Sequence, residues 1–481
     1  MTGFKSLSLL LTLPLIVMSC SSGTPVESEL EDPGAGLAKK GTLSVSSGSG
    51  QSARQLEALA NTVRFRYVDG NGDPIVGALI RAETDSEAAE VSPSTVETNA
   101  DGEAAFQWNL GYEYHNSLKA SVVGTEGLEA VASAVATFRY FPPSPVSDGW
   151  PVRSLDETDP GVQRIFEGID HIRRGAFTGI HSVVIAHKGE IVFETYFEGS
   201  DSQGRNWQWS RTTPHEQQSA SKSFRSALIG IAIDRGFMSL ETLVVDLFPE
   251  FDHLFAETKR EITVKDFLTM SSGLEWTESG AAAGFSNNNL SAMYSLPQAS
   301  WTEYLFSRPM AFSPGTHFEY NTGASLLLDD MVTRVSGMTR RNFVYSFYYD
   351  QIESSNTEGG PQPESGQLKT SREMAKLGQI YLDKGMWKQT RVVSESWVED
   401  SFVEHMTPTT GVGYGYQWWM RSLTTPKATY RIRYAGGNGG QYIFVIDELD
   451  LVLVSTGGNF GSSLMNQFFT IAESYLIPAF E

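Results

Sequence analysis

Ser219 and Lys222 are the two residues whose types and spacing most directly suggest chemistry. They form the only Ser-x-x-Lys pattern in the 481 residues. Side chains three residues apart share one face of a helix, so the amine could reach the hydroxyl. A serine hydroxyl is a weak nucleophile until a neighbouring group that has lost its own proton takes the hydroxyl proton. The pair therefore predicts a nucleophilic serine activated by a lysine.

The residues that follow Ser219 predict the helix that would position this pair. Apolar residues recur at helical spacing between Phe224 and Ile231, and Gly236 provides a stop. Ser219 would then lie at the positive end of the helix, and burial of Lys222 would lower its pKa towards the range that a base needs. The alternative is that Ser219 only caps the helix and Lys222 is a solvated residue of its first turn.

Composition limits the classes of function. A chain of 481 residues normally contains more than one domain, and 40% hydrophobic residues are enough for a large core. The net charge of −21 argues against nucleic acid as a partner, because phosphate binding needs a basic surface. The charge suggests a soluble, exported surface, and the alternative that we prefer is simply a soluble protein.

The N-terminus predicts export and a lipid anchor. A short basic start is followed by an apolar run at residues 7–18, which is too short to span a bilayer, and then by Cys20. Cys20 is the only cysteine, so an intramolecular disulfide is excluded. Residues 17–20 resemble a bacterial lipobox, which implies a lipoprotein signal peptide at 1–20, lipid on Cys20, and a membrane-bound location in the cell envelope, periplasmic or outer-membrane anchored. The alternative is an ordinary signal peptide that ends near a cysteine.

Between residues 21 and 159 the chain changes character three times. Residues 21–51 are rich in Ser, Gly, Glu and Pro and predict a flexible linker. Residues 52–141 contain short strand patterns separated by Gly and Asp turns, which predict an all-β sandwich. Residues 142–159 are Pro-rich and predict a stiff linker.

The predicted sandwich also carries a motif. The pattern D-x-x-G-x-P-x-x-G begins at Asp69, and T-x-x-D-G-x-A begins at Thr98. Together they resemble bacterial immunoglobulin-like domains of the invasin type. The resemblance implies a spacer or an adhesion module, with a carbohydrate or a protein as its candidate ligand.

The remainder, residues 160–481, mixes helices and strands. Strand patterns at 180–186 and 191–196 predict a hairpin, helical patterns dominate from 219 to about 400, and strand patterns return at 442–446 and 449–455. We therefore expect an α+β domain in which both ends of the segment join one antiparallel sheet, flanked by helices and accompanied by a helical subdomain.

Three further stretches extend the pattern around Ser219. Residues 262–274 contain a T-x-x-x-F-L-x-x-x-S-G-L segment, residues 314–322 contain Tyr320, and residues 434–441 are glycine-rich. With the Ser-x-x-Lys motif they resemble the penicillin-binding and β-lactamase-like serine hydrolases, in the branch of class C β-lactamases, family VIII esterases and 6-aminohexanoate-dimer hydrolases. The resemblance covers roughly residues 170–460 and implies a β-lactamase/transpeptidase-like fold.

The resemblance assigns Tyr320 to proton transfer with Lys222. A phenol near an ammonium group ionises more easily, so it can take the serine proton and later protonate a leaving group. Both residues stay candidates for the deprotonated partner, because strongly coupled groups titrate together. The family often has Tyr-x-Asn, whereas here Asn321 comes one place early and Thr322 stands at the Asn position. That departure argues against recognition of β-lactams or peptidoglycan. The alternative for Tyr320 is a core aromatic.

The glycine-rich stretch occupies the place of the family's Lys-Thr-Gly motif. Gly436 matches its glycine, while Tyr434 and Ala435 replace the Lys and Thr that grip a substrate carboxylate. A strand edge without Cβ atoms lets a substrate backbone approach closely. The backbone N–H groups of Gly437 and Ser219 would form the oxyanion hole. The alternative is a plain glycine turn. The candidate oxyanion and substrate-binding residues are Gly436, Gly437, Asn438 and Gly439.

The aromatic run at residues 413–419 also resembles a family stretch, and core packing is the more frequent role for any one of its rings. The loop at residues 278–300 has no readable specificity code. The sequence lacks Gly-x-Ser-x-Gly, His-Glu-x-x-His and a phosphate-binding loop, so we expect neither an α/β-hydrolase, nor a metal site, nor a cofactor.

Three hypotheses follow. The first is a serine hydrolase that acts on a small ester or amide through an acyl-enzyme on Ser219. The second keeps the fold but assigns a D,D-peptidase or β-lactamase activity. The third is a non-catalytic surface protein, in which the sandwich adheres and the C-terminal domain is a scaffold.

Overall fold

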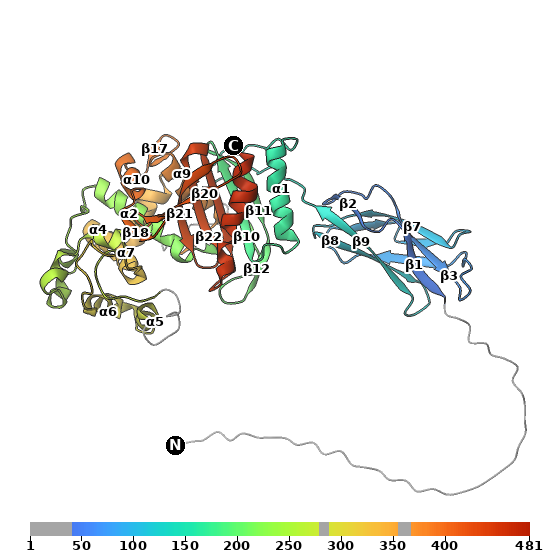
Figure 1. Cartoon of the computed structure of the whole chain (residues 1–481), viewed down its shortest axis with the longest axis horizontal. Helices are drawn as coiled ribbons and strands as arrows, with labels where there is room; N and C mark the ends of the chain where they lie inside the picture. Colours follow the sequence, from blue (N-terminus) through green and yellow to red (C-terminus); the bar gives the residue numbers. More distant parts are fainter. Residues whose placement is uncertain (1–40, 279–287, 355–366) are drawn as a thin grey trace, which may run out of the picture.

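The computed structural model describes residues 41–278, 288–354 and 367–481 and contains two parts that lie end to end (Figure 1). The N-terminal part is built of β-strands, and the larger C-terminal part mixes helices and strands. The predicted lipidation site Cys20 and the predicted signal peptide lie outside the described residues, as does part of the loop predicted at 278–300.

The N-terminal part consists of two sheets that share one apolar core. Phe65 and Phe106 enter this core from one sheet, and Ile80 and Leu118 enter it from the other. One sheet has the order β1 (Thr42–Ser47), β3 (Val63–Val68), β7 (Glu103–Asn109) and β5 (Glu90–Ser92). The other has the order β2 (Gln51–Arg54), β9 (Glu129–Thr137), β8 (His115–Val122), β4 (Leu79–Glu83) and β6 (Thr95–Glu97).

The start of this part differs from the expectation. The sequence predicts a flexible linker at 21–51. Residues 21–40 lie outside the described residues, but from residue 42 on, β1 pairs antiparallel with β3 and β2 pairs with β9. Leu43 is only 6% exposed, and Val45 packs against the same core. In an edge strand only alternate residues turn towards the core. Two apolar side chains in a Ser- and Gly-rich stretch are therefore enough to hold β1 against the sheet.

The C-terminal part is organised around an eight-stranded antiparallel sheet. As expected, a hairpin from the start of this part and strands from its end lie side by side, because β10 pairs with both β11 and β23. The α+β prediction is therefore confirmed. The strand order is β11 (Glu190–Tyr196), β10 (Ile180–His187), β23 (Leu451–Gly457), β22 (Gln441–Ile446), β21 (Thr429–Gly437), β20 (Trp419–Thr424), β19 (Val412–Tyr414) and β18 (Met406–Thr409).

Both faces of this sheet are buried. In β10, Val183 and Ile185 face one core, and Val184 and Ala186 face the other. The first core is completed by α1 (Pro160–Arg173) and α11 (Gln467–Ile471). The second contains α2 (Ser221–Asp234), α3 (Val244–Leu247), α4 (Val264–Leu268), α5 (Asn289–Tyr294), α6 (Trp301–Ser307), α7 (Thr322–Ser336), α8 (Arg340–Val344), α9 (Ser371–Leu382) and α10 (Glu395–Ser401).

Short two-stranded pairs complete the larger part. β14 leads directly towards Ser219, and its partner β15 follows the undescribed residues 355–366. The pairs are β12 (Glu198–Ser200) with β13 (Asn206–Gln208), β14 (His215–Glu216) with β15 (Leu368–Lys369), and β16 (Met386–Trp387) with β17 (Thr390–Arg391).

The segment predicted as a Pro-rich linker at 142–159 is packed against the larger part. Trp150 is 3% exposed, and its indole N–H donates to the carbonyl of Gly189 at 3.0 Å. Tyr140, which the sequence places in the sandwich, is 4% exposed, and its hydroxyl donates to the carbonyl of Val192 at 2.9 Å. Buried aromatic side chains hold this segment against the larger part, so it is not a free linker between the two parts.

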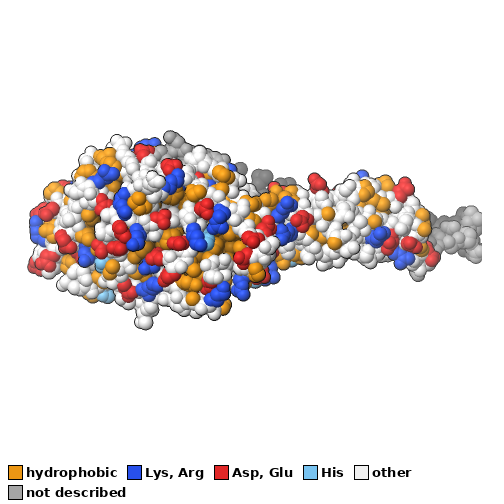
Figure 2. Space-filling model, turned by 90° about the horizontal axis from the view of Figure 1, so that it is seen from above, with side chains coloured by type: hydrophobic (Ala, Val, Ile, Leu, Met, Phe, Trp, Pro, Cys, Tyr) orange, Lys and Arg blue, Asp and Glu red, His pale blue; other side chains and the backbone are white. Residues whose placement is uncertain are grey.

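The two parts are joined by further polar contacts. The guanidinium of Arg173, at the end of α1, donates to the carbonyls of Ala136 at 2.8 Å and Tyr112 at 2.6 Å. On the face seen in Figure 2, acidic and basic side chains are interspersed over both parts. Within the described ranges, no helix has the length and apolar character needed to cross a membrane.

Candidate active site

Ser219 and Lys222 lie together at the start of the central helix. Ser219 is in a single 3-10 turn, η1 (Gln218–Ala220), which runs directly into α2. The Lys222 side chain, one turn further on, is 3% exposed, and its Nζ donates to Ser219 Oγ at 3.0 Å. Gln218 has a φ of +48°, a left-handed conformation that non-glycine residues rarely adopt, so the backbone bends sharply just before Ser219.

The environment of Lys222 favours a neutral amine. Burial lowers the pKa of Lys222 to about 7, a shift that the carboxylate of Glu278 opposes and the guanidinium of Arg225 reinforces. The amine can therefore lose its proton near neutral pH, far below the ordinary range of a lysine. A neutral amine within hydrogen-bond distance of a hydroxyl is a candidate general base.

Tyr320 completes a group of three. It directly precedes Asn321, the N-cap of α7, and Lys222 Nζ lies 4.8 Å from the centre of its ring. Burial raises the pKa of the Tyr320 phenol above its ordinary value, and hydrogen bonding with Ser219 partly offsets that rise. The phenol therefore keeps its proton at neutral pH and can donate it. The structure thus brings the three predicted residues together.

The glycine-rich stretch lies against the turn that carries Ser219. A Cβ atom on Gly437 would lie 2.4 Å from the carbonyl oxygen of Gln217 and 3.0 Å from the backbone nitrogen of Ala220. Only a residue without a side chain lets β21 come this close. Gly436 and Asn438 line the same pocket as Ser219, while Gly439, with a φ of +96°, forms the turn after β21. The Asn438 side chain is partly engaged, since its Oδ1 accepts from the Gly461 N–H at 2.7 Å.

The segment after Tyr320 explains the displaced asparagine. Asn321 is buried, and its Oδ1 accepts from the Ala324 N–H at 2.8 Å, so it caps α7. Thr322, at the family's Asn position, donates from both its hydroxyl and its N–H to the carboxylate of Glu278, at 2.5 and 2.8 Å. Trp276 also donates to Glu278, at 2.5 Å. A carboxylate therefore occupies this side of the site.

Sequence reasoning missed Glu278 as a site residue, because it placed this residue only at the start of a loop without a readable code. No local motif marks Glu278. The indirect signal is Thr322, which stands where the family has an Asn. A buried threonine hydroxyl needs a hydrogen-bond acceptor, and that acceptor had to come from another segment of the chain.

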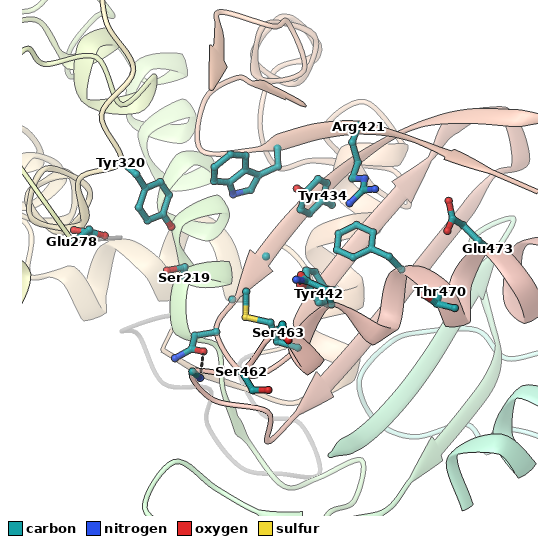
Figure 3. A pocket seen from close by; sticks show the side chains of 18 residues that line it. Ser219, Glu278, Tyr320, Arg421, Tyr434, Tyr442, Ser462, Ser463, Thr470 and Glu473 are labelled. Carbon is teal, nitrogen blue, oxygen red and sulfur yellow. Dashed lines mark hydrogen bonds between the residues drawn. The ribbon is translucent and has the colours of Figure 1, made fainter. Parts of the chain in front are cut away.

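A pocket of about 850 Å³ opens next to Ser219 and extends along the sheet (Figure 3). Trp419 lines it and stacks on Tyr320, with ring centres 5.8 Å apart. Its neighbour Trp418 directly precedes β20 and is buried in the core on the other face of the sheet. Of the aromatic run at 413–419, Trp419 is therefore the ring that reaches the pocket.

The far wall of the pocket was not predicted from the sequence. It combines strands β20, β21 and β22 with the segment that follows β23. No spacing rule connects these segments, which meet only when the sheet and the C-terminal helices pack. The missed lining residues include Arg421, Tyr442, Met465, Phe469 and Glu473, whereas Tyr434 belongs to the predicted glycine-rich stretch.

Comparisons with known proteins agree with this architecture. No curated protein matches the chain. Among solved structures, a proposed 6-aminohexanoate-dimer hydrolase from Bacillus anthracis is 21% identical, with a TM-score of 0.52, over 69% of this chain and 87% of its own. EstCE1, a hydrolase with promiscuous acyltransferase activity, is 14% identical, with a TM-score of 0.52, over 65% and 98%. A penicillin-binding protein homologue from Caulobacter crescentus is 14% identical, with a TM-score of 0.51, over 67% and 98%.

Identities this low support the fold alone. The sequence model of the β-lactamase family, however, matches residues 162–456, which is more than half of the chain. This range contains Ser219, Lys222, Tyr320 and the glycine-rich end of β21. The chain therefore belongs to the β-lactamase family of serine hydrolases and related penicillin-binding proteins.

Proposed function

We propose that the protein hydrolyses a small ester or amide through an acyl-enzyme on Ser219. The observation that carries this proposal is the 3.0 Å contact between Lys222 Nζ and Ser219 Oγ, next to Tyr320 and open to a pocket of about 850 Å³. The buried amine, the serine and the phenol supply a base, a nucleophile and an acid in one place.

Acylation begins when neutral Lys222 accepts the proton of Ser219 and Oγ bonds to the substrate carbonyl carbon. The carbonyl oxygen takes up negative charge, and the backbone N–H groups of Ser219 and Gly437 are the candidate donors to it. Tyr320 then gives its proton to the leaving oxygen or nitrogen as the carbon–heteroatom bond breaks, and it recovers a proton from the Lys222 ammonium. The amine is neutral again, and the proton count balances.

Deacylation reverses the roles with water as the nucleophile. Neutral Lys222, through Tyr320 or directly, takes one proton from the water as its oxygen attacks the acyl carbon. Ser219 Oγ leaves and is reprotonated, which regenerates the starting enzyme. The directions of the two pKa shifts favour Lys222 rather than Tyr320 as the deprotonated partner in the free enzyme.

Two features favour simple esters or amides over β-lactams and peptidoglycan. The side-chain oxygen of Asn321 caps α7 and so is not available to a substrate. The carboxylate of Glu278, bound to Thr322, lies where the family places the neutral amide of an Asn. Tyr434 and Ala435 replace the Lys and Thr that would grip a carboxylate beside the nucleophile. A β-lactam, whose carboxylate lies near its reactive carbonyl, lacks its usual anchor here.

The test is hydrolysis of short-chain p-nitrophenyl esters by the purified protein and by Ser219→Ala. We expect turnover by the parent and its loss in the variant, with a covalent acyl adduct on Ser219 detectable by mass spectrometry after rapid quenching. Equal rates in both proteins would refute Ser219 as the nucleophile. Absence of turnover for esters, amides and penicillins alike would refute the hydrolase proposal and favour the hypothesis of a non-catalytic scaffold.

We also propose that Cys20 carries lipid and that the N-terminal sheets hold the hydrolase away from the membrane as an immunoglobulin-like spacer. The lipobox resemblance at 17–20 supports the first point, and the two-sheet architecture supports the second. Metabolic labelling with a radioactive fatty acid should mark the parent protein in its bacterial host and leave Cys20→Ser unlabelled. Equal labelling of both would refute the anchor.

A further inference from the structure

The pocket beside Ser219 is elongated and has two chemically different ends. Figure 3 shows Ser219 and Tyr320 at one end and Arg421 and Glu473 at the other, with Tyr434 lying between them. The middle is apolar and aromatic, while the far end contains two charged residues, Arg421 and Glu473, that the catalytic steps above do not use.

Arg421 is held in place at that far end. It lies on β20 two residues beyond Trp419, so both side chains leave the same face of the strand. Its guanidinium carbon lies 4.5 Å from the centre of the Phe469 ring, a cation–π contact that favours this position of the group. The side chain is only partly exposed.

Arg421 has no acidic partner within the described part of the chain. Among residues 41–278, 288–354 and 367–481, no carboxylate lies within ion-pair distance of its guanidinium. The neighbouring arginines of the same sheet are paired, Arg431 with Glu404 at 2.7 Å and Arg433 with Asp447 at 2.8 Å. Glu473 lines the same end of the pocket, but its Oε1 accepts from the backbone N–H of Thr424 at 3.0 Å. A partly buried guanidinium without a counter-charge favours an external anion.

We infer that Arg421 binds a carboxylate of the substrate, so that the preferred substrates are esters or amides in which an apolar spacer separates the scissile carbonyl from a terminal carboxylate. This inference rests on the proposed function at Ser219. Arginine suits the task because its planar fork matches a carboxylate with two parallel hydrogen bonds. The anchor that the family places beside the nucleophile is thus replaced by one at the far end.

The sheet register sets the length of the spacer. Arg421 pairs with Ile432, which lies five residues before Gly437 on β21. At a rise of about 3.3 Å per residue, the Cα atoms of Arg421 and Gly437 are about 17 Å apart along the strands. This separation sets the length of the spacer on the order of 10 Å. Tyr434 and Phe469 lie along it and favour a hydrocarbon chain.

The experiment compares two esters of sebacic acid. One is the mono-p-nitrophenyl ester with a free carboxylate, and the other is the same molecule with that carboxylate capped as a methyl ester. We expect the parent protein to prefer the free acid by about 10- to 100-fold in kcat/KM, the range of a hydrogen bond to a charged group. Arg421→Gln should bring the ratio close to one. Glu473→Gln should raise the ratio, because it removes a like charge from the same end.

Arg431→Gln is the matched control, because it removes the same charge from the same sheet at a position already paired with Glu404. It should keep the preference of the parent protein. A ratio that is the same in the parent and in Arg421→Gln would overturn the inference, and hydrolysis that still depends on Ser219 would leave the proposed function standing.

A binding measurement distinguishes failure of the inference about Arg421 from failure of the proposed ester hydrolysis. Calorimetry with sebacate and the Ser219→Ala protein needs no turnover, and adding Arg421→Gln should weaken binding by at least about tenfold. Loss of binding together with absence of ester hydrolysis would support the anion site and refute the ester-hydrolase proposal. Equal binding with and without Arg421 would overturn the inference whatever the kinetics show.

Discussion

Gly437→Ala is the substitution whose effect follows most directly from the geometry. The new Cβ would lie 2.4 Å from the carbonyl oxygen of Gln217, whereas ordinary contact begins near 3.4 Å. The strand end and the turn that carries Ser219 must therefore separate by about 1 Å. A displacement of that size at a reacting centre costs on the order of 100-fold in rate. We expect kcat/KM for p-nitrophenyl acetate to fall by about that factor.

The matched control is Gly436→Ala, one residue earlier on the same strand. Its new Cβ would lie 3.2 Å from a ring atom of Tyr442, which can move by a few tenths of an ångström. We expect a loss of less than about tenfold. Thermal unfolding of both variants shows whether lost activity reflects lost structure. If Gly437→Ala keeps its rate within about threefold of the parent, then close approach of β21 to Ser219 is not needed for the reaction.

Three further predictions follow from the site and the packing. Because neutral Lys222 is the active form, kcat/KM should rise with pH through about 7 and then level off, and a rise near the ordinary lysine pKa of 10.5 would contradict the assignment. The carboxylate of Glu278 raises the pKa of Lys222, so Glu278→Gln should move the rise in kcat/KM to lower pH. Tyr320→Phe should lower kcat for esters by about 100-fold or more, with little change in thermal stability, and a smaller loss in stopped-flow or steady-state assays would remove Tyr320 from proton transfer. Trp150→Ala should lower the free energy of unfolding by about 3–5 kcal/mol in urea titrations, and a change below about 1 kcal/mol would show that the supposed linker contributes little to the core.

The reacting groups are largely readable from the sequence, because local rules place them. Ser219 and Lys222 meet through helical spacing alone. The hairpin of β10 and β11 follows from two apolar runs around a Gly turn, and the segment around Tyr320 lies beside a helix start that Asn321 marks. In each case a few consecutive residues determine the geometry.

The rest of the pocket depends on contacts between distant segments. Arg421 and Phe469 meet only because β20 pairs with β21 and the C-terminal helices pack over that sheet. Composition also gives a wrong prediction where one or two buried side chains hold a segment against the core. Leu43 anchors a strand inside a Ser- and Gly-rich stretch, and Trp150 anchors a Pro-rich one, so average composition predicts linkers where single buried residues determine the structure.

The pairing of β10 with β23 has a consequence for the order in which the chain folds. All strands of the N-terminal part lie between residues 42 and 137, so this part has every pairing partner early in synthesis. β10 is buried on both faces of its sheet, yet one of its two neighbours, residues 451–457, is made only after residues 188–450. Pairings between distant segments form slowly and leave apolar strands open to aggregation. The larger part must therefore keep an apolar hairpin without its second partner until residues 451–457 have been made.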